Sequence, residues 1–175
     1  MKLLSASCLF ALVFFAPLPV SAQFGGLFRS SVDVENIGVR EMTKKLAVQI
    51  NAVEAAKQKG ETPPEADFVV VDVRSPKEMS LSIIPGAITK KQFEANREKY
   101  EDRLVIPYCL SGVRSARFAQ QLAKDGIETK NFKGSILKWV QEELPLVTLD
   151  GKPTKRVYLD PERYDLPSQY EAITP

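Results

Sequence analysis

The stretch Tyr108-Cys109-Leu110-Ser111-Gly112-Val113-Arg114-Ser115 decides how this chain folds. An apolar run, Leu104-Val105-Ile106, leads into it, and a helical pattern from Ser115 to Lys124 follows it. These patterns predict a buried strand, a tight loop that begins at Cys109, and a helix. Because open α/β sheets bind their ligands outside the carboxyl ends of the strands, this loop is the candidate functional site.

The predicted position of Cys109 favours a reactive thiol. The N–H groups of a tight loop and the N-terminus of the following helix present positive partial charge. A thiol in that field loses its proton more readily, and the thiolate is the nucleophilic form. Position alone leaves a second interpretation open, because free cysteines are often small buried hydrophobic residues.

The rest of the chain alternates between strand-like and helix-like patterns, which predicts a mostly parallel sheet covered on both faces. The apolar run from Phe68 to Val73 is typical of a parallel strand buried on both faces. One stripe predicts the core-facing side of a helix: Met42, Leu46, Ile50, Val53 and Ala56. The expected strands are 32–37, 68–73, 87–89, 104–108 and 127–132, and the expected helices are 39–59, 76–80, 91–100, 115–124 and 136–142.

Length and composition limit the possible functions. The 175 residues suffice for one domain with a substantial core. The net charge of +2 gives no indication of a nucleic-acid partner. The chain contains no histidine, which excludes a Cys–His dyad, a Ser–His–Asp triad and histidine metal sites. We therefore expect no metal and no cofactor, and any chemistry of Cys109 must use backbone groups, Arg114 and nearby hydroxyls.

Residues 1–22 have the pattern of a secretory signal peptide. Lys2 supplies the positive charge, Leu3 to Ala16 contains no charged residue, and Val20-Ser21-Ala22 offers a cleavage site. An uncleaved anchor is the alternative, but this run is shorter than the roughly 20 residues of a spanning helix. We expect an exported protein, periplasmic or secreted, with no stable membrane insertion after cleavage.

The mature chain divides by composition into three parts. We expect a flexible arm over 23–31, one domain over 32–149, and a proline-rich C-terminal extension over 150–175 that packs on the domain. Cys8 is removed with the signal peptide, so Cys109 has no intramolecular disulfide partner. A single thiol cannot perform the dithiol chemistry of a C-x-x-C pair.

Four stretches, in this order and spacing, resemble the rhodanese (sulfurtransferase) family. They are Asp72-Val73-Arg74 with Glu78, Ile84-Pro85-Gly86-Ala87-Ile88, Cys109 to Ser115, and Asn131-Phe132-Lys133-Gly134 with Trp139 and Leu144-Pro145-Leu146. The chain departs from the family where Ser135 replaces a second glycine and where Ser82-Ile83 replaces a Gly-His pair. The resemblance covers about 32–146 and implies an α/β, rhodanese-like fold with a five-stranded, mostly parallel sheet and helices on both faces.

The resemblance also implies a sulfurtransferase. In such an enzyme Cys109 would take sulfane sulfur from a small donor or a protein persulfide, carry it as a persulfide, and pass it to a thiol acceptor. The loop N–H groups would stabilise the persulfide anion. The implied loop and substrate-binding residues are Leu110, Ser111, Gly112, Val113, Arg114 and Ser115, and the implied supporting residues are Asp72, Arg74 and Glu78.

Three of these roles have alternatives. Arg114 either contacts an anionic donor such as thiosulfate or, as we prefer, holds the loop through a salt bridge to Glu78 or Asp72. Asp72 is at least as well explained as a residue that caps a turn. Ser115 either donates a hydrogen bond to the sulfur or, as we prefer, caps the following helix.

Two other functions remain as alternatives. Phosphatases and arsenate reductases surround an oxyanion with a Cys-x-x-x-x-x-Arg loop, but only residues 110–113 separate Cys109 from Arg114. A shorter loop suits one sulfur atom better. The second alternative is a rhodanese-like binding or redox-sensing module without catalysis. Within the sulfurtransferase reading, apolar Leu110 and Val113 attract a small dianion weakly and favour a persulfide donor.

Overall fold

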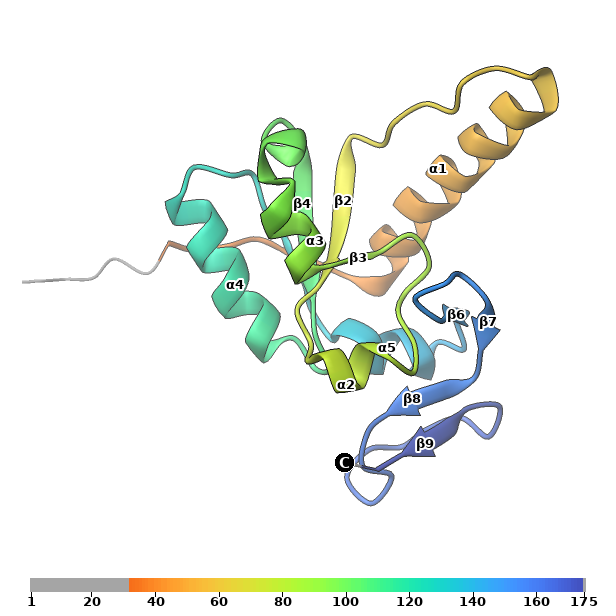
Figure 1. Cartoon of the computed structure of the whole chain (residues 1–175). Coiled ribbons are helices and arrows are strands. Elements are labelled where there is room, and N and C mark those ends of the chain that lie inside the picture. The colour runs from red at the N-terminus through yellow and green to blue at the C-terminus, as the bar shows by residue number, and fades with distance from the viewer. Residues whose placement is uncertain (1–31, 175) are drawn as a thin grey trace, which may run out of the picture. The chain divides into compact units, whose positions relative to one another are not determined.

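Two parallel strands, β2 (Phe68–Asp72) and β4 (Leu104–Tyr108), form the centre of the fold in the computed structural model, which describes residues 32–174 (Figure 1). They pair over their full length, from Phe68 with Leu104 to Asp72 with Tyr108. Every residue of both strands is buried. This burial explains the apolar composition of both runs. The predicted signal peptide and arm, 1–31, lie outside the described residues.

Three further strands extend this pair. On one side β3 (Ile88–Thr89) pairs with β2, and on the other β5 (Asn131–Phe132) pairs with β1 (Asn36–Ile37), all in parallel. The β1–β5 pair joins β4 through one parallel bridge between Val105 and Thr129. The strand order is therefore β1-β5-β4-β2-β3, as a three-stranded and a two-stranded sheet connected at a single bridge.

Helices cover both faces of the strands, as predicted. One core cluster packs α1 and α5 against the side chains of Phe68, Val70 and Ile106. A second packs α3 and α4 against Val69 and Val71 on the opposite face. The helices are α1 (Val39–Lys59), α2 (Pro76–Met79), α3 (Lys90–Ala95), the 3-10 helix η1 (Arg97–Tyr100), α4 (Val113–Lys124) and α5 (Ser135–Gln141).

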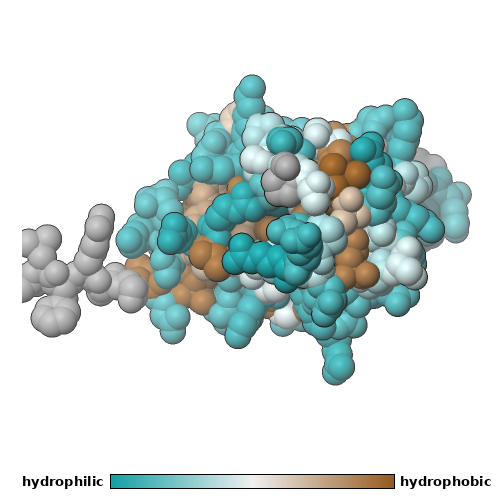
Figure 2. Space-filling view, turned by 90° about the horizontal axis from the view of Figure 1, so that it is seen from below, coloured by the Kyte–Doolittle hydropathy of each residue, from teal (hydrophilic) through white to brown (hydrophobic). Residues whose placement is uncertain are grey.

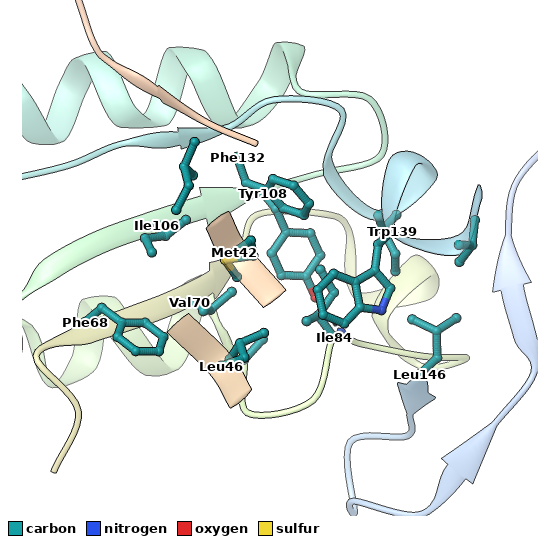
Figure 3. Close-up of a cluster of buried hydrophobic side chains, with 14 of the residues drawn as sticks. Met42, Leu46, Phe68, Val70, Ile84, Ile106, Tyr108, Phe132, Trp139 and Leu146 are labelled. Atoms are coloured by element: carbon teal, nitrogen blue, oxygen red, sulfur yellow. Dashed lines mark hydrogen bonds between the residues drawn. The ribbon is translucent and has the colours of Figure 1, made fainter. Parts of the chain in front are cut away.

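The larger cluster is organised around Tyr108, whose ring lies among side chains from α1, β2 and α5 (Figure 3). Its hydroxyl accepts the N–H of Ile84 at 3.1 Å, so the polar end of this buried ring is satisfied. Phe132 and Trp139 meet edge to face with ring centroids 6.5 Å apart. The indole N–H of Trp139 donates to the carbonyl of Pro145 at 2.8 Å.

The structure corrects several predicted boundaries. Ile50 is 47 % exposed instead of buried, because it borders an open pocket with Phe68 and Tyr100, whereas Ala56 further along α1 is buried. The predicted helix 91–100 divides into α3 and η1, because the Asn96 side chain donates to the carbonyl of Gln92 and its backbone leaves the helical region. The outer strands β1 and β5 are also shorter than 32–37 and 127–132.

The C-terminal residues form regular structure of their own. Strands β6 (Leu146–Val147) and β7 (Pro153–Thr154) form an antiparallel pair, and β8 (Arg156–Tyr158) and β9 (Glu171–Ile173) form a parallel pair. Val157 and Leu159 are buried in the larger core cluster. Figure 1 shows β8 near α2, with β9 on the far side of β8. Within residues 32–174, no helix is both long and apolar enough to cross a membrane.

A buried ion pair lies where β2 ends. Arg74 donates from Nε at 3.0 Å and from Nη2 at 2.6 Å to the Asp72 carboxylate, and both side chains are fully buried. Asp72 also accepts the Arg74 backbone N–H at 3.0 Å, as in an Asx turn. Arg74 Nη2 donates further to the Ser82 carbonyl at 2.6 Å. The pair thus connects the end of β2 to the segment before β3.

We predict that Arg74→Met lowers the free energy of unfolding by about 3–5 kcal/mol, because it leaves the Asp72 carboxylate buried without its partner. Urea denaturation measures the change. The matched control is Arg97→Met, which breaks the exposed pair with Asp125 and should have a much smaller effect. Equal losses in the two variants would contradict the prediction.

Candidate active site

Cys109 directly follows the central strand β4, and the chain turns into α4 within three residues. The helix begins at Val113, two residues earlier than predicted, and Gly112 is its N-cap residue. Gly112 has φ +104°, and a Cβ there would lie 3.3 Å from the Gly134 nitrogen. The loop therefore requires glycine at this position, both for its backbone conformation and for its close approach to the neighbouring chain.

Hydrogen-bond donors surround the Cys109 sulfur, although the residue is only 1 % exposed. The Gly112 N–H donates to Sγ at 3.1 Å, and the hydroxyl oxygens of Ser115 and Ser135 lie 3.7 and 3.9 Å from Sγ. Burial by itself would raise the pKa of the Cys109 thiol. The N–H groups of Ser115, Gly112 and Ser111, with the Ser115 hydroxyl, outweigh burial and lower that pKa.

Ser115 lies in the first turn of α4 and does not cap it, so the preferred interpretation of this residue was wrong. Its hydroxyl donates to Asn131 Oδ1 at 2.7 Å, and Asn131 in turn donates to Asn36 at 2.9 Å. A hydroxyl has a single proton, and Asn131 is a nearer acceptor than the sulfur of Cys109. We therefore attribute the lowered Cys109 pKa mainly to the backbone N–H groups.

Of the two carboxylates considered for Arg114, the structure brings Glu78 to it. Arg114 donates to Glu78 from Nη1 at 2.8 Å and from Nη2 at 2.6 Å. Glu78 also accepts the N–H and hydroxyl of Ser75, whose side chain caps α2 in return. Burial would raise the pKa of Glu78, but the hydrogen bonds from Arg114 and Ser75 hold it at about 2. Asp72 is instead occupied by Arg74.

The first turn of α5 forms backbone hydrogen bonds with the start of the loop. The N–H of Ile136 donates to the carbonyl of Cys109 at 3.2 Å, and the N–H of Leu137 donates to the carbonyl of Leu110 at 3.0 Å. The side chain of Leu110 packs against the larger core cluster, so it does not form part of the rim. Ser111 is exposed.

The rim of the loop carries one apolar and one charged side chain. Val113 is 61 % exposed. The Arg114 side chain is 45 % exposed, and its pKa is raised above the ordinary value, first by the hydrogen bond to Glu78 and to a smaller extent by Cys109. Within residues 32–174, no three His, Cys, Asp or Glu side chains gather in a possible metal-binding group.

Sequence reasoning missed three residues that support this site: Asn36, Asn131 and Ser135. Asn131 and Ser135 belong to or follow a stretch that had been noted only for its family resemblance. The asparagines act through Ser115, and Ser135 contacts Cys109 directly. No sequence pattern indicated that Asn36 supports the site, because its role depends on the pairing of β1 with β5.

Comparison with known proteins identifies the class. The family model described as rhodanese-like domain matches residues 51–142. The chain is 33 % identical over 89 residues to a sulfurtransferase of Allochromatium vinosum, a match that covers 49 % of this chain and 83 % of that protein. This protein therefore belongs to the rhodanese-like family, and the predicted family is confirmed.

Other relatives share the domain within longer chains. The chain is 29 % identical over 144 residues to a tRNA uridine(34) hydroxylase of Bacillus licheniformis, covering 76 % of this chain but 41 % of that protein. Among solved structures, a thiosulfate sulfurtransferase of Pseudomonas aeruginosa superposes with a TM-score of 0.51 at 18 % identity, covering 68 % of this chain and 21 % of the other. This structural similarity confirms the fold.

We predict that Cys109 is alkylated by iodoacetamide with a pH midpoint below the value of about 8.5 for an ordinary thiol, because loop N–H groups stabilise the thiolate. Mass spectrometry of the peptide that contains Cys109 follows the rate against pH. Unfolding in urea should return the midpoint to the ordinary value. A midpoint at or above about 8.5 in the folded protein would contradict the prediction of a lowered pKa.

A second prediction concerns pH and stability. Because the pKa of Glu78 is about 2 in the folded protein against 4.5 ordinarily, its ion pair stabilises the fold above about pH 4.5 and loses that effect as the pH falls toward 2. Arg114→Met should make the stability less dependent on pH. It should also lower the free energy of unfolding at pH 7 by about 1–2 kcal/mol, which is less than the loss expected for a buried ion pair, because about half of the Arg114 side chain faces water.

Denaturation curves between pH 2 and pH 7 measure both effects. The control is Arg117→Met, since Arg117 is exposed one turn further along α4 and has no salt bridge within residues 32–174. If Arg114→Met keeps the wild-type stability and pH dependence, the pair does not hold the loop.

Proposed function

We propose that this protein is a sulfurtransferase that carries sulfane sulfur as a persulfide on Cys109 and transfers it to a thiol acceptor. One observation carries the proposal. The Cys109 sulfur lies at the carboxyl end of the central strand, accepts a loop N–H at 3.1 Å, and belongs to a thiol with a lowered pKa. Membership of the rhodanese-like family, with a sulfurtransferase among the relatives, supports the same chemistry.

The reaction proceeds in two displacements. In the first, the Cys109 thiolate attacks the outer sulfur of the donor, and a new S–S bond forms as the bond between that sulfur and the rest of the donor breaks. The donor leaves with the electron pair, as sulfite from thiosulfate or as a thiolate from a persulfide. In the second, an acceptor thiolate attacks the terminal sulfur, and Cys109 leaves as a thiolate again. Each step conserves charge and needs no separate oxidant.

The loop assists both steps by placing N–H donors where negative charge resides. Donors that are already oriented need little rearrangement when charge moves between sulfur atoms. The Arg114–Glu78 pair supports this orientation, because it ties the first turn of α4 to α2. Arg114 is thus a positioning residue in this proposal.

A persulfide donor fits the rim better than thiosulfate. Val113 offers an exposed apolar side chain beside the loop, and the positive charge of Arg114 is already paired with Glu78. Both features weaken attraction for a small dianion. The face of the molecule seen from below is largely hydrophilic, with smaller hydrophobic patches (Figure 2).

A phosphatase is the less suitable function for this loop. Only residues 110–113 separate Cys109 from Arg114, and both terminal nitrogens of Arg114 donate to Glu78. A non-catalytic binding or redox-sensing module is the other alternative. We further propose that the reaction occurs outside the cytoplasm, on the basis of the signal-peptide pattern of 1–22.

We predict that the protein incubated with glutathione persulfide gains the mass of one sulfur atom on Cys109 and releases it to excess thiol, and that Cys109→Ser does neither. Mass spectrometry of the intact chain follows the transfer and also reports whether the exported protein begins at Gln23. Ser168→Ala, a change in an exposed serine outside the loop, is the matched control and should keep the activity. A sulfur adduct on Cys109 that excess thiol does not remove would contradict sulfur transfer and favour a sensor. Cys109-dependent release of phosphate from an aryl phosphate, with no persulfide formed, would favour a phosphatase.

A further inference from the structure

Ser135 has an unfavourable backbone conformation for its residue type. It is the first residue of α5, it is fully buried, and its φ is +52°, in the left-handed region that disfavours side chains with a Cβ. Glycine would adopt the same angle without strain. A strained residue at a site persists when its surroundings stabilise it, so the contacts of its side chain are informative.

The Ser135 hydroxyl contacts the backbone of the candidate nucleophile. It accepts the N–H of Cys109 at 3.0 Å and donates to the carbonyl of Phe132 at 3.0 Å. The same oxygen lies 3.9 Å from the Cys109 sulfur. Glycine would provide none of these interactions. The serine therefore has a strained backbone conformation but forms a polar contact with Cys109.

This contact completes the attachment of Cys109 to α5. The carbonyl of Cys109 already accepts the N–H of Ile136, at 3.2 Å. With Ser135 accepting the N–H, both backbone polar groups of Cys109 bond to the first two residues of the same helix. Two bonds on opposite sides of the Cα atom fix the direction in which the side chain leaves the backbone.

We propose that Ser135 is a positioning residue for Cys109, and that its hydroxyl proton turns from the Phe132 carbonyl to the sulfur when the sulfur is negatively charged. The proton can do so by rotation about the Cβ–Oγ bond, because both acceptors surround the same oxygen. The effect on the thiolate is independent of sulfur transfer, whereas the effect on the persulfide rests on the proposed function. Arg114 from α4, paired with Glu78 from α2, is the charged group facing the same sulfur, and it is unchanged by substitution at Ser135.

Two substitutions separate the hydroxyl from the backbone strain. Ser135→Ala removes the hydroxyl and keeps a Cβ at positive φ, whereas Ser135→Gly removes both. We expect Ser135→Gly to melt at a higher temperature than Ser135→Ala. We expect both to raise the pH midpoint of Cys109 alkylation by about half a unit or more, because a donor to the thiolate is lost. A merely structural role would change the melting temperature without moving this midpoint.

The measurements are alkylation against pH, thermal melting, and the rate at which excess thiol removes sulfur from the loaded protein. Ser168→Ala, at an exposed serine of the C-terminal extension, is the control and should leave the midpoint unchanged. An unchanged midpoint in Ser135→Gly overturns the inference. If the midpoint shifts in both variants but the wild-type protein never acquires a sulfur atom, the positioning role stands and the proposed function fails. If sulfur transfers normally in all variants with an unchanged midpoint, the proposed function stands and the role of Ser135 fails.

Discussion

The ion pair between Arg114 and Glu78 is the interaction on which the geometry of the site depends. It joins α4, whose first N–H groups approach the Cys109 sulfur, to α2, which lies on a separate segment of the chain. Glu78 is itself fixed by the cap that it shares with Ser75. Loop, helix start and cap therefore form one connected polar unit, and a change in any member alters the orientation of the N–H donors.

Features that depend on neighbouring residues were predictable from the sequence. The buried strand before Cys109, the tight loop that begins at Cys109 and the burial of the central apolar runs follow from local patterns, and the structure contains all three. The choice of Glu78 over Asp72 as partner of Arg114 was not predictable, because it depends on Arg74 occupying Asp72 in three dimensions. Ile50 was misassigned for a related reason, since a helical stripe does not show which of its positions other elements cover.

Ser135 illustrates what a departure from a family pattern can mean. In the sequence, Ser135 indicated only that the chain lacks a glycine expected from the family resemblance. Its conformation and its contact with the Cys109 backbone depend on residues 26 positions apart, which no local pattern encodes. Violations of local preference tend to occur at functional sites, where a specific contact compensates for the strain.

The order of residues along the chain has a consequence for when the thiol becomes reactive. Asn131 and Ser135 follow Cys109 in the sequence, and Asn131 bonds to Asn36, 95 residues earlier. During synthesis, Cys109 emerges before these partners exist, so it begins as an ordinary thiol that is mostly protonated at neutral pH. Such distant contacts form slowly compared with local helices and turns. The N–H groups that lower the Cys109 pKa belong to the loop itself, so what these later contacts with Asn131 and α5 supply is the orientation of the loop around the sulfur.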